Sequence, residues 1–212
     1  WERNISGNVS TVSNVTTMDS MFMFAKSFNQ QLDKWNVSNV NTMENMFFGA
    51  TSFNGKVKGW GQTESNGQKV SNGHVTNLSH MFDGATSFNQ EVKEWYVKEV
   101  TDFSYMFSGA TRFNKKIFSD THKAENTSYM FFGAKKFNQD LDFKFNKSKE
   151  SHPITFMSHM FDGAKQFNGD ISKWDVSTVT DMSYMFNQTA FNRNITNWNV
   201  KNVTDMSFMF FR

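Results

Sequence analysis

The dipeptide Met-Phe recurs along this chain at nearly even intervals. Eight of its occurrences mark equivalent positions, which we number as copies 1 to 8: Met21, Met46, Met81, Met106, Met130, Met160, Met185 and Met209. Written out, the unit is MFxGAxxFNxxhxxWxVxxVxxMxx, where h is Leu, Val or Ile. A unit of about 25 residues is too short to bury its own apolar side chains, so each copy must stack on its neighbours. The sequence therefore predicts a single solenoid domain of about eight stacked repeats over residues 1–212, and we expect a longer natural chain because both ends fall inside repeat units.

Within each copy, the spacing of apolar residues predicts two kinds of local structure. The stretch from Phe-Asn to Trp, such as FNGDISKW at residues 167–174, alternates apolar and polar positions as a short strand does. In VTDMSYMF, the apolar residues Val179, Met182, Met185 and Phe186 have the spacing of a single helical or 3-10 turn. The Gly-Ala pair that follows Met-Phe permits a tight corner. We therefore expect a repeat solenoid of short parallel β-strands with one helical or 3-10 turn per coil.

An Asn follows the second Phe of each of the first seven copies, next to a predicted core residue. A polar side chain in such a place needs hydrogen-bond partners, and amides in successive coils can bond along the axis or satisfy backbone groups at a corner. We interpret this column as a structural ladder rather than as a ligand site. Its members are Asn29, Asn54, Asn89, Asn114, Asn138, Asn168 and Asn192.

The segments at residues 167–186 and 191–209 carry the pattern FNxxIxxWxVxxVTDMSxMF. This pattern resembles the mycoplasma-type surface-lipoprotein repeats of the domain of unknown function 285, a branch of the BspA-like leucine-rich repeats, and the resemblance extends over essentially the whole chain. It implies a leucine-rich-repeat-like solenoid. It also implies a surface or secreted protein with an adhesive or host-contact role, and related repeats occur in large viruses. The family supplies no catalytic residues.

Copies 4 and 5 depart from the pattern because they lack the Trp that other copies carry. Phe118, and then Phe143 or Phe145, lie near the vacant position and are expected to fill the same volume. Copy 7 reads MFNQTAFN, which lacks the Gly of the corner and is one residue short.

Composition removes several classes of function. With 22 Lys and Arg against 20 Asp and Glu, the net charge of +2 gives no reason to expect nucleic acid or an anionic membrane as partner. The absence of cysteine excludes disulfides and thiolate metal sites. No apolar run approaches the roughly 20 residues of a membrane-spanning helix, so no membrane insertion is expected in this segment. The eight Lys from Lys115 to Lys149 are offset by five acidic residues, which favours a solvated face over a phosphate site.

The residue immediately before Met-Phe is a ring in six of the eight copies. The column contains Ser20, Asn45, His80, Tyr105, Tyr129, His159, Tyr184 and Phe208. We interpret it as a packing ladder. Its two His are three coils apart and cannot share a metal ion. Asp102, Asp181 and Asp205 do not form a regular cation ladder either, so we expect turn or capping roles for them and no metal site.

Two copies are longer than the others, and both insertions fall between the Trp position and the next Val-to-Met stretch. They occupy residues 61–74 in copy 2 and 146–153 in copy 5, which predicts loops at the same corner of the rod. The alternative is that these insertions are neutral sequence changes, which an exposed corner tolerates. The candidate partner-contact residues are Thr63, Glu64, Lys69, His74, Lys147, Lys149 and His152.

No cluster of titratable residues stands out from the repeat, so we expect neither an enzyme nor a cofactor. The leading hypothesis is a cell-surface or secreted binding or adhesion solenoid that presents a repeat face and corner loops to a protein partner. The alternative is a structural component of a virion or an extracellular filament, which assembles by self-association through the solenoid ends.

Overall fold

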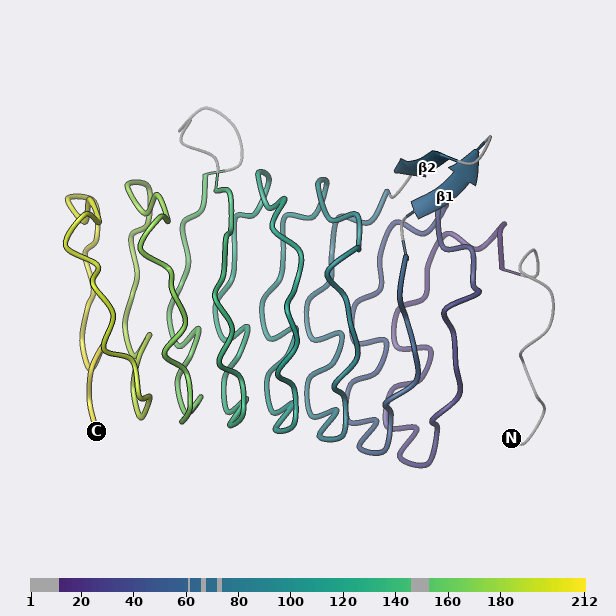
Figure 1. The fold of residues 1–212 in the computed structure, drawn as a ribbon, viewed down its shortest axis with the longest axis horizontal. Helices are drawn as coiled ribbons and strands as arrows, with labels where there is room; N and C mark the ends of the chain where they lie inside the picture. Colours follow the sequence, from purple (N-terminus) through teal and green to yellow (C-terminus); the bar gives the residue numbers. More distant parts are fainter. Residues whose placement is uncertain (1–11, 61, 66–67, 72–73, 146–152) are drawn as a thin grey trace.

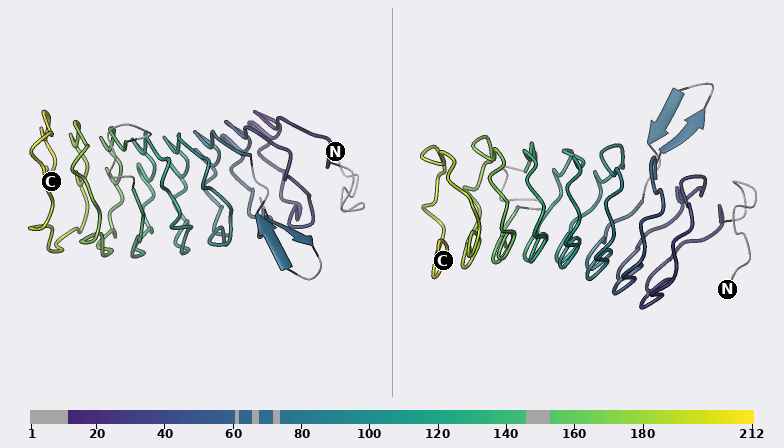
Figure 2. Two further views of the ribbon diagram at one scale, coloured as in Figure 1. Left: turned by 90° about the horizontal axis from the view of Figure 1, so that it is seen from above. Right: turned by 60° about the horizontal axis from the view of Figure 1, so that its bottom comes forward.

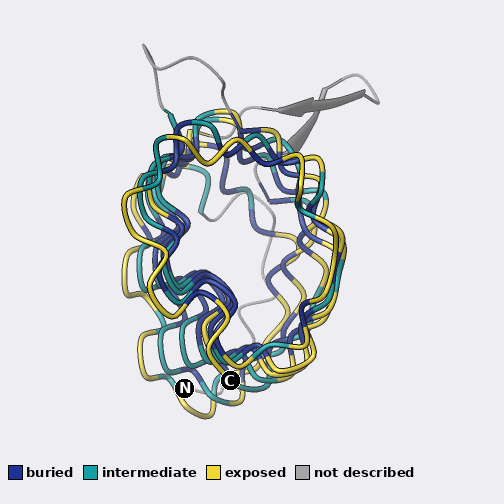
Figure 3. Cartoon of the chain, turned by 90° about the vertical axis from the view of Figure 1, so that its left-hand side faces the viewer, coloured by how far each residue is buried: buried dark blue, intermediate teal, exposed yellow. Residues whose placement is uncertain are grey.

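The computed structural model describes residues 12–60, 62–65, 68–71, 74–145 and 153–212. Successive copies of the repeat form successive coils, which are stacked side by side along one long axis (Figure 1). Views from above and from a tilted direction show the same stack (Figure 2). Viewed along this axis, the coils lie one behind another in nearly the same outline (Figure 3).

Two columns of Phe form the centre of each coil. The Phe of Met-Phe stacks on the Phe of Phe-Asn in the same coil, with ring centroids 3.9 Å apart for Phe47 and Phe53 and 3.8 Å apart for Phe82 and Phe88. Each also stacks on its equivalent in the next coil, as Phe47 does on Phe82 at 5.4 Å. These four side chains are fully buried, so the Phe columns form one continuous apolar core.

A third column contains the Trp residues and the Phe residues that replace them. Trp60 and Trp95 stack at 5.5 Å, and each donates its indole N–H to the aliphatic residue of the preceding coil, Trp95 to the Val57 carbonyl at 2.7 Å. Where Trp is missing, Phe118 and Phe143 are buried, and Phe143 stacks on Trp174 at 5.5 Å. The prediction that Phe fills the vacant Trp volume is confirmed.

The predicted fold class is wrong in its local structure. The described residues contain no helix and only two strands, β1 (Gln62–Ser65) and β2 (Gln68–Ser71). These strands pair with each other antiparallel, in a hairpin that projects from the rod (Figure 1). Among the residues that the structure describes, neighbouring coils share one isolated parallel bridge at each junction, from Thr17 with Thr42 to Asp181 with Asp205. The chain is therefore not a leucine-rich-repeat-like solenoid of parallel strands with a helical or 3-10 turn per coil.

The hydrogen bonds of the backbone explain why neither element forms. In the segment before and through Met-Phe, alternate N–H groups reach different partners: Phe47 donates to Met81 of the next coil at 2.9 Å, whereas Phe48 donates to Asn45 of its own turn at 3.0 Å. A left-handed residue in every such turn, with φ of 55° at Asn45, prevents a helix from continuing. In the predicted strand, a side-chain oxygen takes the place of a backbone carbonyl, and the Asn54 N–H donates to the Asn29 Oδ1 at 2.7 Å. A regular ladder of backbone bonds is therefore interrupted there.

Glycine serves two separate needs in these coils. The Gly of the Gly-Ala corner has a left-handed backbone, with φ between 63° and 71° in Gly49, Gly84, Gly109, Gly133 and Gly163, as the predicted tight corner requires. After the column Asn, Gly55 and Gly169 instead permit close approach between coils. A Cβ on Gly169 would lie 2.1 Å from the Gln139 carbonyl oxygen, so no larger residue fits without a shift of the backbone.

Candidate functional site: an aromatic ladder on the surface

Six ring side chains form a ladder along the outside of the rod. Adjacent centroids are 4.4 Å apart from the first ring to the fifth and 4.8 Å apart at the last step, with planes within 19° of parallel. The rings are His80, Tyr105, Tyr129, His159, Tyr184 and Phe208. The interpretation of this column as a packing ladder is confirmed.

The backbone turns these rings away from the core. Each ladder residue is left-handed, with φ of 54° at His80, 56° at Tyr105 and 59° at Tyr129. After each of the first five rings, the next two residues, Met and Phe, are buried, as Met106 and Phe107 are. A left-handed conformation costs about 1–2 kcal/mol for an L-residue. Hydrogen bonds between coils, such as that from the Tyr105 N–H to the Ser128 carbonyl at 3.0 Å, stabilise it here.

Each His of the ladder is held by an Asp three residues later. His80 Nδ1 lies 3.0 Å from Asp83 Oδ2, and His159 Nδ1 lies 2.8 Å from Asp162 Oδ2. Because Nδ1 contacts the carboxylate, Nε2 is the nitrogen left at the outer part of the ring. Asp162 is nearly buried and also accepts a bond from Asn187 Nδ2 at 2.8 Å. The C-terminal pair is therefore the more firmly fixed of the two.

The four inner rings of the ladder offer their edges rather than their faces to the solvent, because a neighbouring ring covers each of their faces. The side chain of His80 is 32% exposed and that of His159 is 21% exposed. Burial raises the pKa of Tyr105, and the nearby Tyr129 and Asp83, together with a hydrogen bond to Tyr129, raise it further. Three phenol groups and two imidazoles thus form a row of fixed hydrogen-bonding groups.

Two Phe side chains flank this row. Phe48 lies 6.1 Å from His80, edge to face, and Phe132 lies 5.7 Å from Tyr129. Phe132 is 39% exposed, so an apolar side chain accompanies the ladder near its middle. The sequence analysis missed both flanking residues and both His–Asp pairs. The signal for the pairs is present as HMFDGA, which occurs at residues 80–85 and 159–164, the two places where His enters the column.

The Asn column runs along the coils as a separate row. The amide oxygen of each Asn accepts a hydrogen bond from the backbone N–H of the next Asn, for example from Asn89 to Asn54 and from Asn114 to Asn89, both at 2.9 Å. All six such steps are formed, at 2.7–3.0 Å. The column lies at the surface, since its residues are exposed or half-buried, and not in the core as expected from its place beside Phe.

The predicted loop residues are only partly placed. Thr63 and Glu64 lie in β1, and Lys69 lies in β2, where Glu64 is opposite Lys69 in the hairpin register. His74 is exposed at the end of this insertion. The other three candidates, Lys147, Lys149 and His152, fall outside the described residues. The structure therefore does not show the two loops together.

The Asp residues at the positions that form the isolated bridges between coils have local roles. Asp102, Asp181 and Asp205 each accept a bond at 2.8 Å from the backbone N–H of the Ser two residues later, as expected for turn residues. Within the described parts of the chain, no three His, Asp or Glu side chains gather closely enough to hold a metal ion. Among the same residues, no helix is long and apolar enough to cross a membrane.

A comparison with protein-family models gives one match, repeated along the chain. The family described as "Mycoplasma protein of unknown function, DUF285" matches residues 3–72, 62–153 and 147–212. The chain belongs to this family. The three overlapping matches show that this DUF285 member is a repeat protein throughout. Comparisons with curated proteins and with solved structures found no match.

Proposed function

We propose that this DUF285 protein is a non-enzymatic binding module, at a cell surface or secreted, that presents its aromatic ladder to a protein partner. The observation that carries the proposal is the row of stacked, partly exposed rings from His80 to Tyr184 with Phe132 beside it. Aromatic side chains are enriched at protein interfaces because they bury a large area and also carry polar groups.

The binding of a partner to the ladder also has a low cost in conformational entropy. Stacking on both faces holds the Tyr129 ring between Tyr105 and His159, each at 4.4 Å, so little freedom is left to lose when a partner docks. The exposed edges supply hydroxyl and imidazole groups for directional contacts. Phe132, 39% exposed, supplies an apolar contact next to them.

The kinship with BspA-like repeat proteins and the adhesive role belong to this proposal. The resemblance of the repeats to surface proteins supports a location outside the cell. Assembly into a virion or filament through the ends of the stack stays a prediction of the sequence.

A pair of variants tests the ladder against cell-surface protein extracts. The ladder variant is Tyr105→Ser with Tyr129→Ser, and the control is Asp33→Ser with Lys34→Ser, which changes two exposed residues elsewhere and keeps the net charge. We expect at least one protein to be retained by the wild type and the control but not by the ladder variant. Tyr129→Phe, which keeps the stack and removes one hydroxyl, then separates apolar from polar contributions. If every retained protein also binds the ladder variant, the ladder is not the binding surface.

A further inference from the structure

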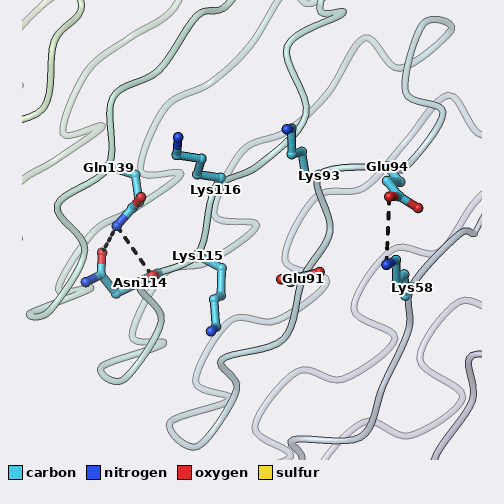
Figure 4. A pocket seen from close by; sticks show the side chains of 8 residues that line it. All are labelled: Lys58, Glu91, Lys93, Glu94, Asn114, Lys115, Lys116 and Gln139. Atoms are coloured by element: carbon cyan, nitrogen blue, oxygen red, sulfur yellow. Dashed lines mark hydrogen bonds and ion pairs between the residues drawn. The ribbon is translucent and has the colours of Figure 1, made fainter.

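A shallow groove lies beside Asn114 of the Asn column, and no ladder residue lines it (Figure 4). It has a volume of about 450 Å³ and adjoins a second hollow of about 280 Å³. Five lysines line the two hollows: Lys56, Lys58, Lys93, Lys115 and Lys116. We call these residues the groove lysines. They come from copies 2, 3 and 4, and Gln139 of copy 5 also lines the groove, so the groove crosses four coils.

The groove lysines are largely without partners in the protein. Lys58 lies 3.8 Å from Glu94, and both side chains are exposed, so this pair is weak. Among the described residues, the side chains of the other four groove lysines form no ion pair or hydrogen bond. Their charges are therefore available to a ligand.

Four more cations continue this charge around the adjoining corner: Arg112, Lys135, Lys136 and Lys165. We call these residues the corner cations. All four are exposed, and among the described residues their side chains form no hydrogen bond or ion pair. Arg112 precedes Lys115 by three residues with the buried Phe113 between them, so the corner begins where the groove ends.

The register of the Asn column places like charges directly above one another at this corner. Asn138 donates its backbone N–H to Asn114 at 3.0 Å, and Asn168 donates to Asn138 at 2.8 Å. Arg112 and Lys136 both lie two residues before their column Asn, in adjacent coils. Adjacent coils are separated by about 4.8 Å where their backbones bond. Unpaired cations at such a spacing repel each other, and an anionic ligand that spans the coils would relieve the repulsion.

Two of the acidic residues that the sequence sets against these lysines have other contacts. Asp120 pairs with His122, and Asp140 accepts a bond at 2.7 Å from the backbone N–H of Asp170. Only Glu91 and Glu94 line the groove itself. The groove lysines and the corner cations are together nine of the 22 Lys and Arg residues, and we call these nine residues the strip.

The lining of the groove also indicates the class of ligand. Its side chains are polar or charged except for Val57, which is fully buried. A protein partner would usually need an apolar or aromatic anchor, and a single-stranded nucleic acid would need a ring on which its bases stack. The lining has neither. Lysines on flexible stems suit a hydrated, linear chain of hydroxyl and anionic groups.

We propose that the groove lysines and the corner cations bind a sulfated polysaccharide. This ligand is distinct from the protein partner of the aromatic ladder and occupies a different surface. The sulfate groups contact lysines of successive coils, and the sugar hydroxyls contact Asn114 and Gln139, whose amides line the groove. Binding is electrostatic and weakens steeply with salt.

Heparin binding by three double variants of the chain tests this proposal. The groove variant is Lys115→Ser with Lys116→Ser, and the corner variant is Arg112→Ser with Lys136→Ser. The control, Lys34→Ser with Lys201→Ser, loses the same charge at exposed positions outside the strip. We expect the groove and corner variants each to weaken heparin affinity about tenfold, as the loss of two contacts of modest strength implies, with little change in the control. Unchanged melting temperatures would show that all three variants are folded.

The identity of the probe distinguishes the polysaccharide from other polyanions. Desulfated heparin should bind much more weakly than heparin, and so should polyglutamate, oligodeoxythymidine and vesicles of anionic lipid. The proposal is overturned if heparin does not bind, if the control weakens binding as much as the groove variant does, or if another polyanion matches heparin. The ladder variant Tyr105→Ser with Tyr129→Ser should keep full heparin binding. A folded ladder variant that lost it would show that the two surfaces are not separate.

Discussion

The Asn column and the aromatic ladder run along the same coils, yet one repeats a single residue and the other varies. Seven coils carry Asn at one position, whereas the ladder position holds Ser, Asn, His, Tyr or Phe. The difference follows from what each side chain contacts. The amide oxygen of Asn89 accepts the backbone N–H of Asn114, while the ring of Tyr129 contacts other rings. A side chain that satisfies the backbone of a neighbour is fixed in type, and one that contacts only other side chains is free to change.

The largest effect is expected at a glycine that follows a column Asn, where the backbones of two coils lie too close together for a Cβ atom. Gly169→Ala should lower the free energy of unfolding by about 3–4 kcal/mol, because its Cβ would meet the Gln139 carbonyl oxygen. Chemical denaturation measures the loss. Gly59→Ala is the control, since a Cβ there meets nothing within 4 Å and adds only the strain of a φ of 79°, about 1 kcal/mol. Equal losses in the two variants would contradict the close approach.

The next effect is expected from the column Asn itself. Asn89→Ala removes the acceptor of the Asn114 N–H and should cost about 1–2 kcal/mol, a value limited by the partial exposure of the site. Asn192→Ala should cost less, because no described residue donates to its amide oxygen. Thermal melts of the two variants compare them directly. A loss at Asn192 as large as that at Asn89 would show that the bond to the next coil is not the cause.

Exchanges within the ladder should have a smaller effect than any change in the Asn column. Tyr129→His and Tyr129→Phe keep a ring between Tyr105 and His159, so each should change the free energy of unfolding by less than about 0.5 kcal/mol. Tyr129→Ala removes the ring and should cost about 1–2 kcal/mol, through two lost stacking contacts. Denaturation midpoints of the three variants test this order. If Tyr129→His were as harmful as Tyr129→Ala, the ladder position would not be free to vary.

The smallest effect is a dependence of stability on alkaline pH. The raised pKa of Tyr105 means that the folded chain keeps this phenol proton at a pH at which the unfolded chain, with a Tyr pKa of about 10, releases it. The contribution of Tyr105 is therefore complete below about pH 10 and is lost as the pH rises above that value. Stability measured across this range should fall less steeply in Tyr105→Phe than in the wild type. Identical slopes in the two proteins would show that Tyr105 does not contribute to this pH dependence.

The sequence predicted correctly what depends on the order of side chains. The repeated Met-Phe and Phe-Asn pairs indicated the stacked core, and the mixture of rings before Met-Phe indicated a packing ladder. Phe143 was predicted to replace Trp, and it stacks on Trp174. In each case the equivalent residues of successive copies meet in space, so counting along the chain is enough.

The strands and the helical turn could not be predicted because they depend on hydrogen-bond partners. Alternation in residues 167–174 shows which side chains face the core, but not that Asn192 donates its N–H to the Asn168 side chain rather than to a carbonyl. Likewise, the spacing of Met182 and Met185 suits a helical turn, but Tyr184 is left-handed with φ of 56°. The Phe-Asn pair also suggested a buried amide, because a residue next to a core Phe was assumed to share its environment. The groove was missed for a related reason, since net charge and local runs do not show which lysines meet across coils.

The bonds at each junction have a mechanical consequence. Every coil is attached to the next by a similar small set, such as the Phe82 N–H to the Met106 carbonyl and the Phe107 N–H to the Met130 carbonyl. Because each coil touches only its neighbours, a force applied to the two ends would peel the coils off one at a time. Each event would release about 25 residues, which extend by roughly 85 Å when pulled straight. A protein of this kind that tethers one surface to another would then lengthen in steps under load, one coil at a time, before the contacts at either end break.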